Sequence, residues 1–268
     1  MNQIAFIGAG NMASALIQGM LSAGTEPATI RAADIAEAQL QTLANRGVIT
    51  STRNAEVVSG ADIIVLAVKP QVLVDILQPL TLASDQLVVS IAAGIDMQTL
   101  EGATSGQQPI VRCMPNTPAL VGAGMAALFA NGHVTEPQRA AAAAVLEAVG
   151  RALWVPEEAM LDAVTAVSGS GPAYFFYLME AMIEAGVSLG LPEETATELT
   201  LQTALGAARL AQSSEDTPGQ LRRNVTSPGG TTERALDLMN EADVADAIVR
   251  ALKGAAERSA ELAEEFGR

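Results

Sequence analysis

The chain has 268 residues, enough for one large domain or two of ordinary size. Apolar residues make up 49% of it and aromatic residues only 3%, so a core must be built mainly from aliphatic side chains. The 30 acidic residues outnumber the 15 basic ones and give a formal net charge of −15. Because such a surface repels nucleic acid and anionic membranes, we expect neither as a partner.

The cysteine content and the N-terminal residues indicate in which cellular compartment the protein is expected. Cys113 is the single cysteine, so no intrachain disulfide can form. Residues 4–7 are already a strand-like apolar run, with no basic segment or cleavage site before them. No stretch offers the ~20 uninterrupted apolar residues of a spanning helix. We therefore expect a soluble, cytoplasmic protein.

The first half of the chain alternates strand-like and helix-like segments. The expected strands are residues 3–7, 29–33, 62–68, 86–92, 109–114, 124–130 and 151–155. Helical spacing occurs in residues 12–23, 35–46, 72–80 and 137–149. Most of the strands are apolar on both faces, which is typical of a parallel sheet covered by helices on both sides. The alternation predicts an α/β, Rossmann-type doubly wound domain over residues 1–158.

The second half changes character. Residues 174–189, 193–211, 231–239 and 244–266 have helical spacing, and turn residues separate them at 190–192, 218–219 and 227–230. We expect a smaller all-helical domain over residues 159–268. It is too apolar for a lone globule, so we expect a homodimer formed through these C-terminal helices.

Residues 8–13 read Gly-Ala-Gly-Asn-Met-Ala and lie between the first expected strand and the first expected helix. In that context the pattern predicts a dinucleotide site. Gly8 permits the tight turn, and Gly10 lets the backbone approach the pyrophosphate. The phosphates would lie over free N–H groups where the helix begins, at Asn11 and Met12. The alternative is a glycine-rich turn with no ligand.

Asp34 ends the second expected strand, about 20 residues further on. An acidic residue there typically binds the ribose hydroxyls of NAD and repels the 2′-phosphate of NADP. Asp34 could equally be the N-cap of the following helix. Arg31, Arg53 and Asn54 could instead hold a 2′-phosphate, so the choice between NADH and NADPH stays open.

Two later loops follow strands, at the edge of the sheet where ligands bind in such folds. The first contains Val68, Lys69 and Pro70. Lys69 could lie near the nicotinamide half or the substrate, or be a solvated cation. The second contains Asn116, which could hydrogen-bond the nicotinamide carboxamide or the substrate, or hold a turn.

Residues 227–232 read Ser-Pro-Gly-Gly-Thr-Thr and precede a segment with helical spacing. The two glycines leave backbone amides unobstructed, and the helix start adds partial positive charge. The segment predicts a carboxylate-binding site, with a plain helix cap as the alternative. The residues expected to bind substrate here are Ser227, Gly229, Gly230, Thr231 and Thr232.

Other candidates are weaker. Residues 168–174 form a second small-residue cluster, which we interpret as a close helix crossing, while a contribution of Ser168 or Ser170 to a pocket stays open. His133, the single histidine, is expected at the surface. Without a second histidine or further cysteines, we expect no metal.

Together these motifs resemble the pyrroline-5-carboxylate reductase family along the whole chain. The segments that carry the resemblance are residues 6–12, 67–71, 112–118, 168–174, 218–221 and 227–232. The last is the most specific, because many dehydrogenases share the glycine pattern. The resemblance implies reduction of 1-pyrroline-5-carboxylate to L-proline, the last step of proline biosynthesis, with NADPH or NADH.

The resemblance also implies roles for single residues. In the family, the threonine that matches Thr232 hydrogen-bonds the ring nitrogen, and the amides around Gly230 and Thr231 bind the carboxylate. The acidic residue that matches Glu215 lies near the substrate, and the asparagine that matches Asn54 lies by the adenosine ribose. Homodimers with swapped C-terminal helices, often assembled into decamers, are implied as well.

Two alternatives remain. A 3-hydroxyacid dehydrogenase of the same architecture would need a lysine on a helix of the second domain, and only Lys253 follows Lys69. A dinucleotide sensor without catalysis would not need to keep residues 227–232. Both alternatives are therefore less well supported than an imine reductase.

Overall fold

The structure is a computed structural model of the whole chain, and it describes residues 2–104 and 106–266. These residues form two compact units. The first contains the chain up to Ser170 and the residues from Gly254 onward, and the second is Gly171–Lys253. The short helix just before Ser170 packs on the sheet of the first unit, and the domain boundary expected near residue 158 stays a prediction.

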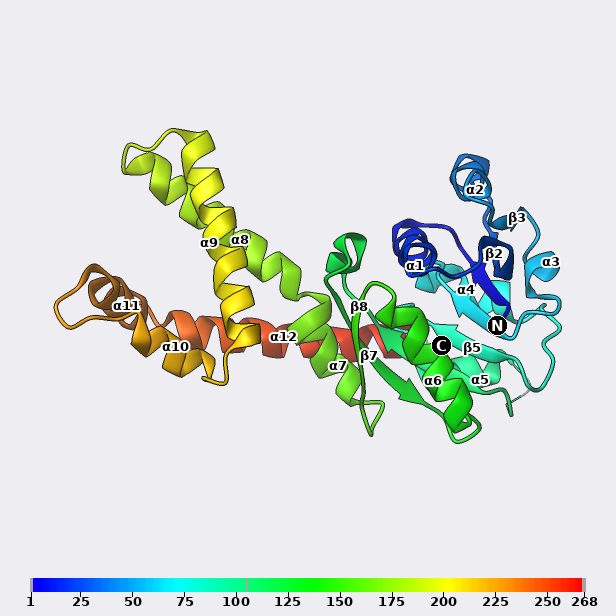
Figure 1. Cartoon of the computed structure of the whole chain (residues 1–268). Helices are drawn as coiled ribbons and strands as arrows, with labels where there is room; N and C mark the ends of the chain where they lie inside the picture. Colours follow the sequence, from blue (N-terminus) through cyan, green and yellow to red (C-terminus); the bar gives the residue numbers. More distant parts are fainter. Residues whose placement is uncertain (1, 105, 267–268) are drawn as a thin grey trace. The chain divides into compact units, whose positions relative to one another are not determined.

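An 8-stranded sheet is the centre of the first unit (Figure 1). Its strands are β1 (Ile4–Ile7), β2 (Ile30–Ala33), β3 (Ile49–Ser51), β4 (Ile63–Leu66), β5 (Leu87–Ser90), β6 (Ile110–Met114), β7 (Gly124–Ala130) and β8 (Gly150–Trp154). Their order is β3-β2-β1-β4-β5-β6-β7-β8. The chain thus builds outward from β1 in one direction and then returns to β1 to build in the other. That reversal places a ligand crevice between the carboxyl ends of β1 and β4.

Helices cover both faces of this sheet. On one face lie α1 (Asn11–Ser22), α2 (Glu37–Ala44) and α6 (Glu136–Glu147), packed in one core cluster with Phe6. On the other face α3 (Asn54–Val58), α4 (Pro70–Leu77) and α5 (Met97–Gly102) pack in a second cluster with Ile7. Successive strand residues point to opposite faces, so β1 supplies both cores. The predicted doubly wound α/β fold is confirmed.

Several elements differ from the prediction. The sheet is not wholly parallel, because β7 runs antiparallel to β6. β3, α3 and α5 were not predicted, and neither were α7 (Met160–Val164) and the π-helix that follows it, Thr165–Gly169. The predicted turn at residues 218–219 is wrong. Pro218 begins α10 (Pro218–Asn224), where a proline without an N–H is well tolerated, and Thr217 caps the helix by accepting from the Gln220 amide at 3.2 Å.

The second unit is entirely helical, as predicted. It contains α8 (Gly171–Ser188), α9 (Glu193–Ser213), α10, α11 (Thr231–Glu241) and the first part of α12 (Val244–Phe266). The α8–α9 pair is close, since a Cβ placed on Gly186 would lie 2.9 Å from the Ala196 Cβ. No residue of α10 or α11 is buried. Many large apolar side chains of this unit are exposed, among them Phe175, Phe176, Tyr177, Leu199, Leu210 and Ile248.

The described part of the chain contains neither a membrane-spanning helix nor a cluster of metal ligands. Over residues 2–104 and 106–266, no helix combines the length and apolar character needed to cross a membrane. In the same residues, no group of three or more His, Cys, Asp and Glu side chains gathers where a metal ion could be held.

Candidate active site

The turn between β1 and α1 can accept only glycine at its first position. Gly8 has φ +95°, and a Cβ placed there would lie 2.6 Å from the Ala67 carbonyl oxygen. Its N–H donates to the Ala33 carbonyl at 2.8 Å, so the turn is tied to β2. Val68, which follows β4, lies directly beside Gly8. The structure thus brings together two of the predicted cofactor segments.

The beginning of α1 fits a dinucleotide. Gly10 is its N-cap, and no side chain caps this helix end. Nothing lies within 4 Å of where a Cβ of Gly10 would stand, so the space above the helix start is open. The first N–H groups of a helix, here at Asn11 and Met12, have no partner within the helix. An anion over Gly10 would receive these donors together with the positive end of the helix dipole.

Asp34 braces the glycine turn from the neighbouring strand. Its carboxylate accepts from the Ala9 amide at 2.6 Å through Oδ2 and from the Ala36 amide at 2.8 Å through Oδ1. Asp34 is not the N-cap of α2, because Ala36 holds that position. The carboxylate charge therefore lies at the pyrophosphate turn and at the carboxyl end of β2. Each oxygen still has a lone pair for a ribose hydroxyl.

The residues near the start of α3 are largely paired within the protein. Asn54 is the first residue of α3, and Arg53 before it forms an ion pair with Glu56. The Arg31 guanidinium donates to the Ser59 carbonyl at the end of the same helix. Arg53 is therefore paired with a carboxylate, whereas Arg31 has only a neutral carbonyl partner, and its buried Nε has no hydrogen-bond partner among the described residues. A cation for a 2′-phosphate thus stays available at Arg31.

The loop after β4 is short and open. Lys69 is exposed and is the N-cap of α4, and Pro70 occupies its first turn. These residues follow β4 at the same edge of the sheet as Gly8, because β1 and β4 are parallel and in register.

Asn116 holds protein groups with both ends of its amide. Its Nδ2 donates to the Ser168 carbonyl at 3.1 Å and to the Ser168 hydroxyl at 3.2 Å, and its Oδ1 accepts from the Met125 amide at 2.9 Å. The side chain thus joins β7 and the π-helix to the loop after β6. π-Helical turns occur frequently at functional sites. These contacts fit the interpretation that Asn116 holds a turn, and its contact with the cofactor stays a prediction.

The loop before α11, predicted to bind substrate, already uses two of its amides. The Gly230 N–H donates to the Ser227 carbonyl at 3.0 Å, and the Gly229 N–H donates to Glu233 Oε2 at 2.6 Å. Gly229 has φ +72°, which favours glycine. No side chain caps the N-cap Gly230, so the amides at the start of α11 remain as donors for a ligand.

Thr231 and Thr232 are the first two residues of α11, and Thr232 is half-buried. Sequence reasoning missed Glu233, although an acidic residue at the third position of a helix is a recognisable capping pattern. Glu215 is exposed in the loop between α9 and α10. All these residues belong to the second unit, whereas the predicted cofactor residues belong to the first.

The single histidine and the single cysteine are not among the candidate site residues. His133 is exposed in the loop before α6, as expected. Cys113 is buried in β6, and burial raises the pKa of its thiol far above the ordinary range. A neutral, buried thiol is a poor nucleophile.

Comparison with family models gives two matches. Residues 158–262 match a model described as pyrroline-5-carboxylate reductase dimerisation. Residues 3–94 match one described as NADP oxidoreductase, coenzyme F420-dependent. Between them the two matches cover the glycine turn in the first unit and the Ser-Pro-Gly-Gly-Thr-Thr segment in the second.

Curated relatives match along the whole chain. A pyrroline-5-carboxylate reductase of Pseudomonas aeruginosa is 52% identical over 268 residues, covering 99% of this chain and 98% of the relative. One of Haemophilus influenzae is 44% identical over 262 residues, covering 97% of each.

Solved structures agree. A pyrroline-5-carboxylate reductase of Coxiella burnetii superposes with a TM-score of 0.90 at 40% identity, covering 97% of this chain and 98% of that one. The Plasmodium falciparum pyrroline carboxylate reductase, solved with NADP bound, gives a TM-score of 0.87 at 30% identity and covers 98% of both chains.

Proposed function

The chain belongs to the pyrroline-5-carboxylate reductase family, and from this premise we propose how its residues reduce 1-pyrroline-5-carboxylate to L-proline. It is an NAD(P)H-dependent oxidoreductase that acts on a C=N group. The observation that carries this function is the 52% identity over 99% of the chain, joined to a β1–α1 turn whose shape suits a pyrophosphate.

The reaction needs little acid–base chemistry from the protein. A nicotinamide dinucleotide, when bound, would supply the hydride for the imine carbon. The ring nitrogen would carry a proton that solvent can provide. The product is a secondary amine, so one hydride and one proton account for the change. What the protein must supply is alignment of the two reacting carbons, an effect that can be worth several kcal/mol.

The first unit would bind the pyrophosphate and the adenosine ribose of the dinucleotide. We assign the pyrophosphate to the amides at Asn11 and Met12, over the open space at Gly10. We assign the adenosine ribose to Asp34 and Asn54, at the carboxyl ends of β2 and β3.

Asp34 would also set the choice between the two cofactors. Its carboxylate stands beside the turn that receives the pyrophosphate, and a 2′-phosphate on the adjacent ribose would be repelled by it. The nearby Arg53 cannot fully offset that repulsion, because it is paired with Glu56. We therefore assign to Asp34 a discrimination against NADPH relative to NADH.

The second unit would hold the imine. The substrate carboxylate would accept from the amides of Thr231 and Thr232, since those of Gly229 and Gly230 are engaged within the loop. The Thr232 hydroxyl would orient the ring nitrogen and stabilise the amine as it forms. Glu215 would lie at the edge of this site.

Oligomerisation follows from the second unit. Its large exposed apolar side chains exceed what a soluble monomer ordinarily leaves in water. We propose a homodimer formed through the C-terminal helices, and assembly of dimers into decamers as the larger state.

The test is product identification. Purified protein is mixed with 1-pyrroline-5-carboxylate and either NADH or NADPH, and both cofactor oxidation and proline are measured. We expect one proline for each cofactor oxidised. Cofactor binding without proline formation would leave the fold intact and favour a sensor or a different imine.

A further inference from the structure

The loop between β5 and α5 lies at the cofactor edge of the sheet. β1, β4 and β5 are parallel and in register, so the loops that follow them emerge at one edge. The residues that we assign to the adenosine half follow β2 and β3, on one side of the glycine turn. β4 and β5 lie on its other side, so their loops face the nicotinamide half.

The middle of this loop offers a ligand mainly its backbone. Ala92, Ala93 and Gly94 follow Ile91 in the loop, and Ala93 is exposed while Ala92 and Gly94 are buried. Gly94 has φ +74°. Because small residues cannot adjust a contact by changing rotamer, the placement of the backbone decides what the loop can bind.

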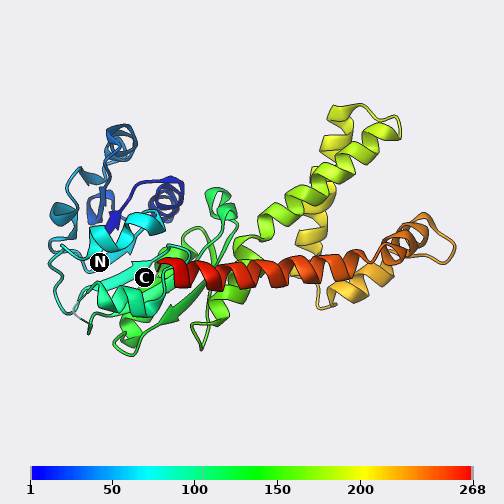
Figure 2. The same cartoon turned by 180° about the vertical axis from the view of Figure 1, so that it is seen from behind.

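The end of α12 packs against the loop (Figures 1 and 2). A Cβ placed on Gly94 would lie 2.9 Å from Phe266 Cδ2 and 3.2 Å from Leu262 Cβ. Phe266 also packs on the core cluster that contains Ala92 and Ile95. The aromatic ring therefore fills the space under the loop from about 170 residues away in the sequence.

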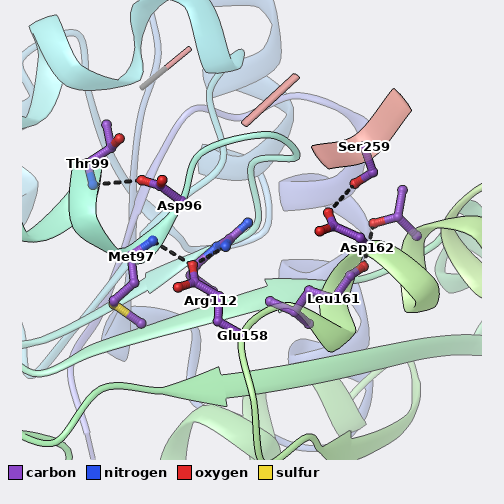
Figure 3. A network of polar contacts seen from close by, with 9 residues as sticks. Asp96, Met97, Thr99, Arg112, Glu158, Leu161, Asp162 and Ser259 are labelled. Carbon is purple, nitrogen blue, oxygen red and sulfur yellow. Dashed lines mark hydrogen bonds and ion pairs between the residues drawn. The ribbon is translucent and has the colours of Figure 1, made fainter. Parts of the chain in front are cut away.

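A second contact holds the other end of the same loop (Figure 3). The Met97 amide donates to Glu158 Oε1 at 2.6 Å, and Glu158 also pairs with Arg112 on β6. The Arg112 side chain is 12% exposed and that of Glu158 is 30% exposed, so the pair is partly shielded from bulk water. Asp96 caps α5 by accepting from the Thr99 amide at 2.8 Å.

A separate hydrogen bond joins α12 to the segment that follows Glu158. The Ser259 hydroxyl donates to Asp162 Oδ1 at 2.7 Å, which joins α12 to α7 (Figure 3). Glu158 lies two residues before α7, so one short segment contacts both the β5–α5 loop and the helix that packs on it.

We propose that Phe266 and Glu158 are positioning residues that fix the β5–α5 loop for the nicotinamide half of the cofactor. This inference rests on the proposed function, because it requires a nicotinamide dinucleotide at this edge. Neither side chain needs to contact the cofactor. Phe266 supports the loop at Gly94, and Glu158 holds the first amide of α5.

The test compares two ligands that differ only at the proposed contact. Dissociation constants of NADH and of ADP-ribose, which lacks the nicotinamide, are measured for Phe266→Ala and Glu158→Ala. We expect NADH to bind about 10-fold more weakly in each variant, the scale of a displaced binding group, while ADP-ribose binds as in the wild type. Phe266→Leu and Glu158→Gln, which keep apolar volume and one acceptor, should recover most of the affinity.

Two controls separate positioning from stability. Val145→Ala removes buried volume from α6, in the core cluster on the opposite face of the sheet, and should lower Tm without changing either dissociation constant. The double variant Phe266→Ala/Glu158→Ala should lose less NADH affinity than the product of the two single losses, because both act on one loop.

Equal effects on NADH and ADP-ribose, or no effect on either, would overturn the inference. Binding is measured without turnover, so this result is independent of whether the wild-type protein reduces the imine. Wild-type protein that binds NADH but forms no proline would count against the proposed function alone.

Discussion

Thr232 offers one hydroxyl to the reaction, in the first turn of α11. We expect Thr232→Ala to lower kcat about 10-fold, the scale of one lost orienting hydrogen bond. Thr232→Ser keeps the hydroxyl and should retain most of the activity, measured as steady-state oxidation of NADH. Wild-type kcat in the alanine variant would remove Thr232 from the mechanism.

A substitution of Asp34 tests the preference between NADH and NADPH. Asp34→Asn removes the charge beside the ribose, so the ratio of kcat/KM for NADPH to that for NADH should rise about 10-fold. Asp62→Asn is a matched control, because Asp62 also accepts from a backbone amide, that of Gln3, but precedes β4 at the opposite edge of the sheet. An unchanged ratio in Asp34→Asn would show that discrimination lies elsewhere.

At the residue scale, the sequence identifies which side chains carry chemistry but not their partners. Gly8, Gly10 and the start of α1 are foreseeable, since the motif and the turn are contiguous. The contact of Asp34 with the Ala9 amide spans 25 residues, and that of Asn116 with Ser168 spans 52. Such pairings depend on how the strands are ordered in the sheet, which local pattern does not encode.

At the scale of single elements, the two glycines of the turn between β1 and α1 are expected to respond differently to substitution. Gly8→Ala should lower Tm markedly, because the new Cβ meets the Ala67 carbonyl and φ is positive. Gly10→Ala should leave Tm near the wild-type value, because its Cβ meets no protein atom, yet weaken NADH binding by about 10-fold or more. Thermal melts and NADH titrations of both variants check this.

The reverse pattern would contradict the assignment of the pyrophosphate to this turn. A Gly10→Ala variant with normal NADH affinity would mean that the space above Gly10 is not where the phosphates bind. A Gly8→Ala variant with normal Tm would mean that the turn relaxes away from Ala67.

Long periodic elements were predictable, whereas several of the short elements were not. α12 was foreseen with its full bounds, since its 23 residues repeat their apolar positions over several turns. β3 has 3 residues and α3 has 5, too few for a period to appear. The antiparallel direction of β7 could not be read either, because a strand's apolar pattern is the same in both directions.

At the scale of the whole molecule, the second unit predicts association. Phe176 on α8 is 58% exposed, and we expect Phe176→Glu to weaken the dimer, because a charge would have to be desolvated there. Sedimentation velocity over a range of concentrations measures the change. Ile35→Glu, at a residue 94% exposed in the first unit, should leave the dimer intact. Wild-type protein that stays monomeric at every concentration would refute the proposed dimer.

The most direct measurement of the central claim follows the hydride itself. NADH carrying deuterium at the transferable position of the nicotinamide is oxidised by the protein with 1-pyrroline-5-carboxylate, and the proline is analysed by mass spectrometry. Direct transfer predicts one deuterium in each proline, on the ring carbon that was part of the C=N bond. Proline without deuterium, or no proline from protein that binds NADH, would contradict the claim that this chain is an imine reductase.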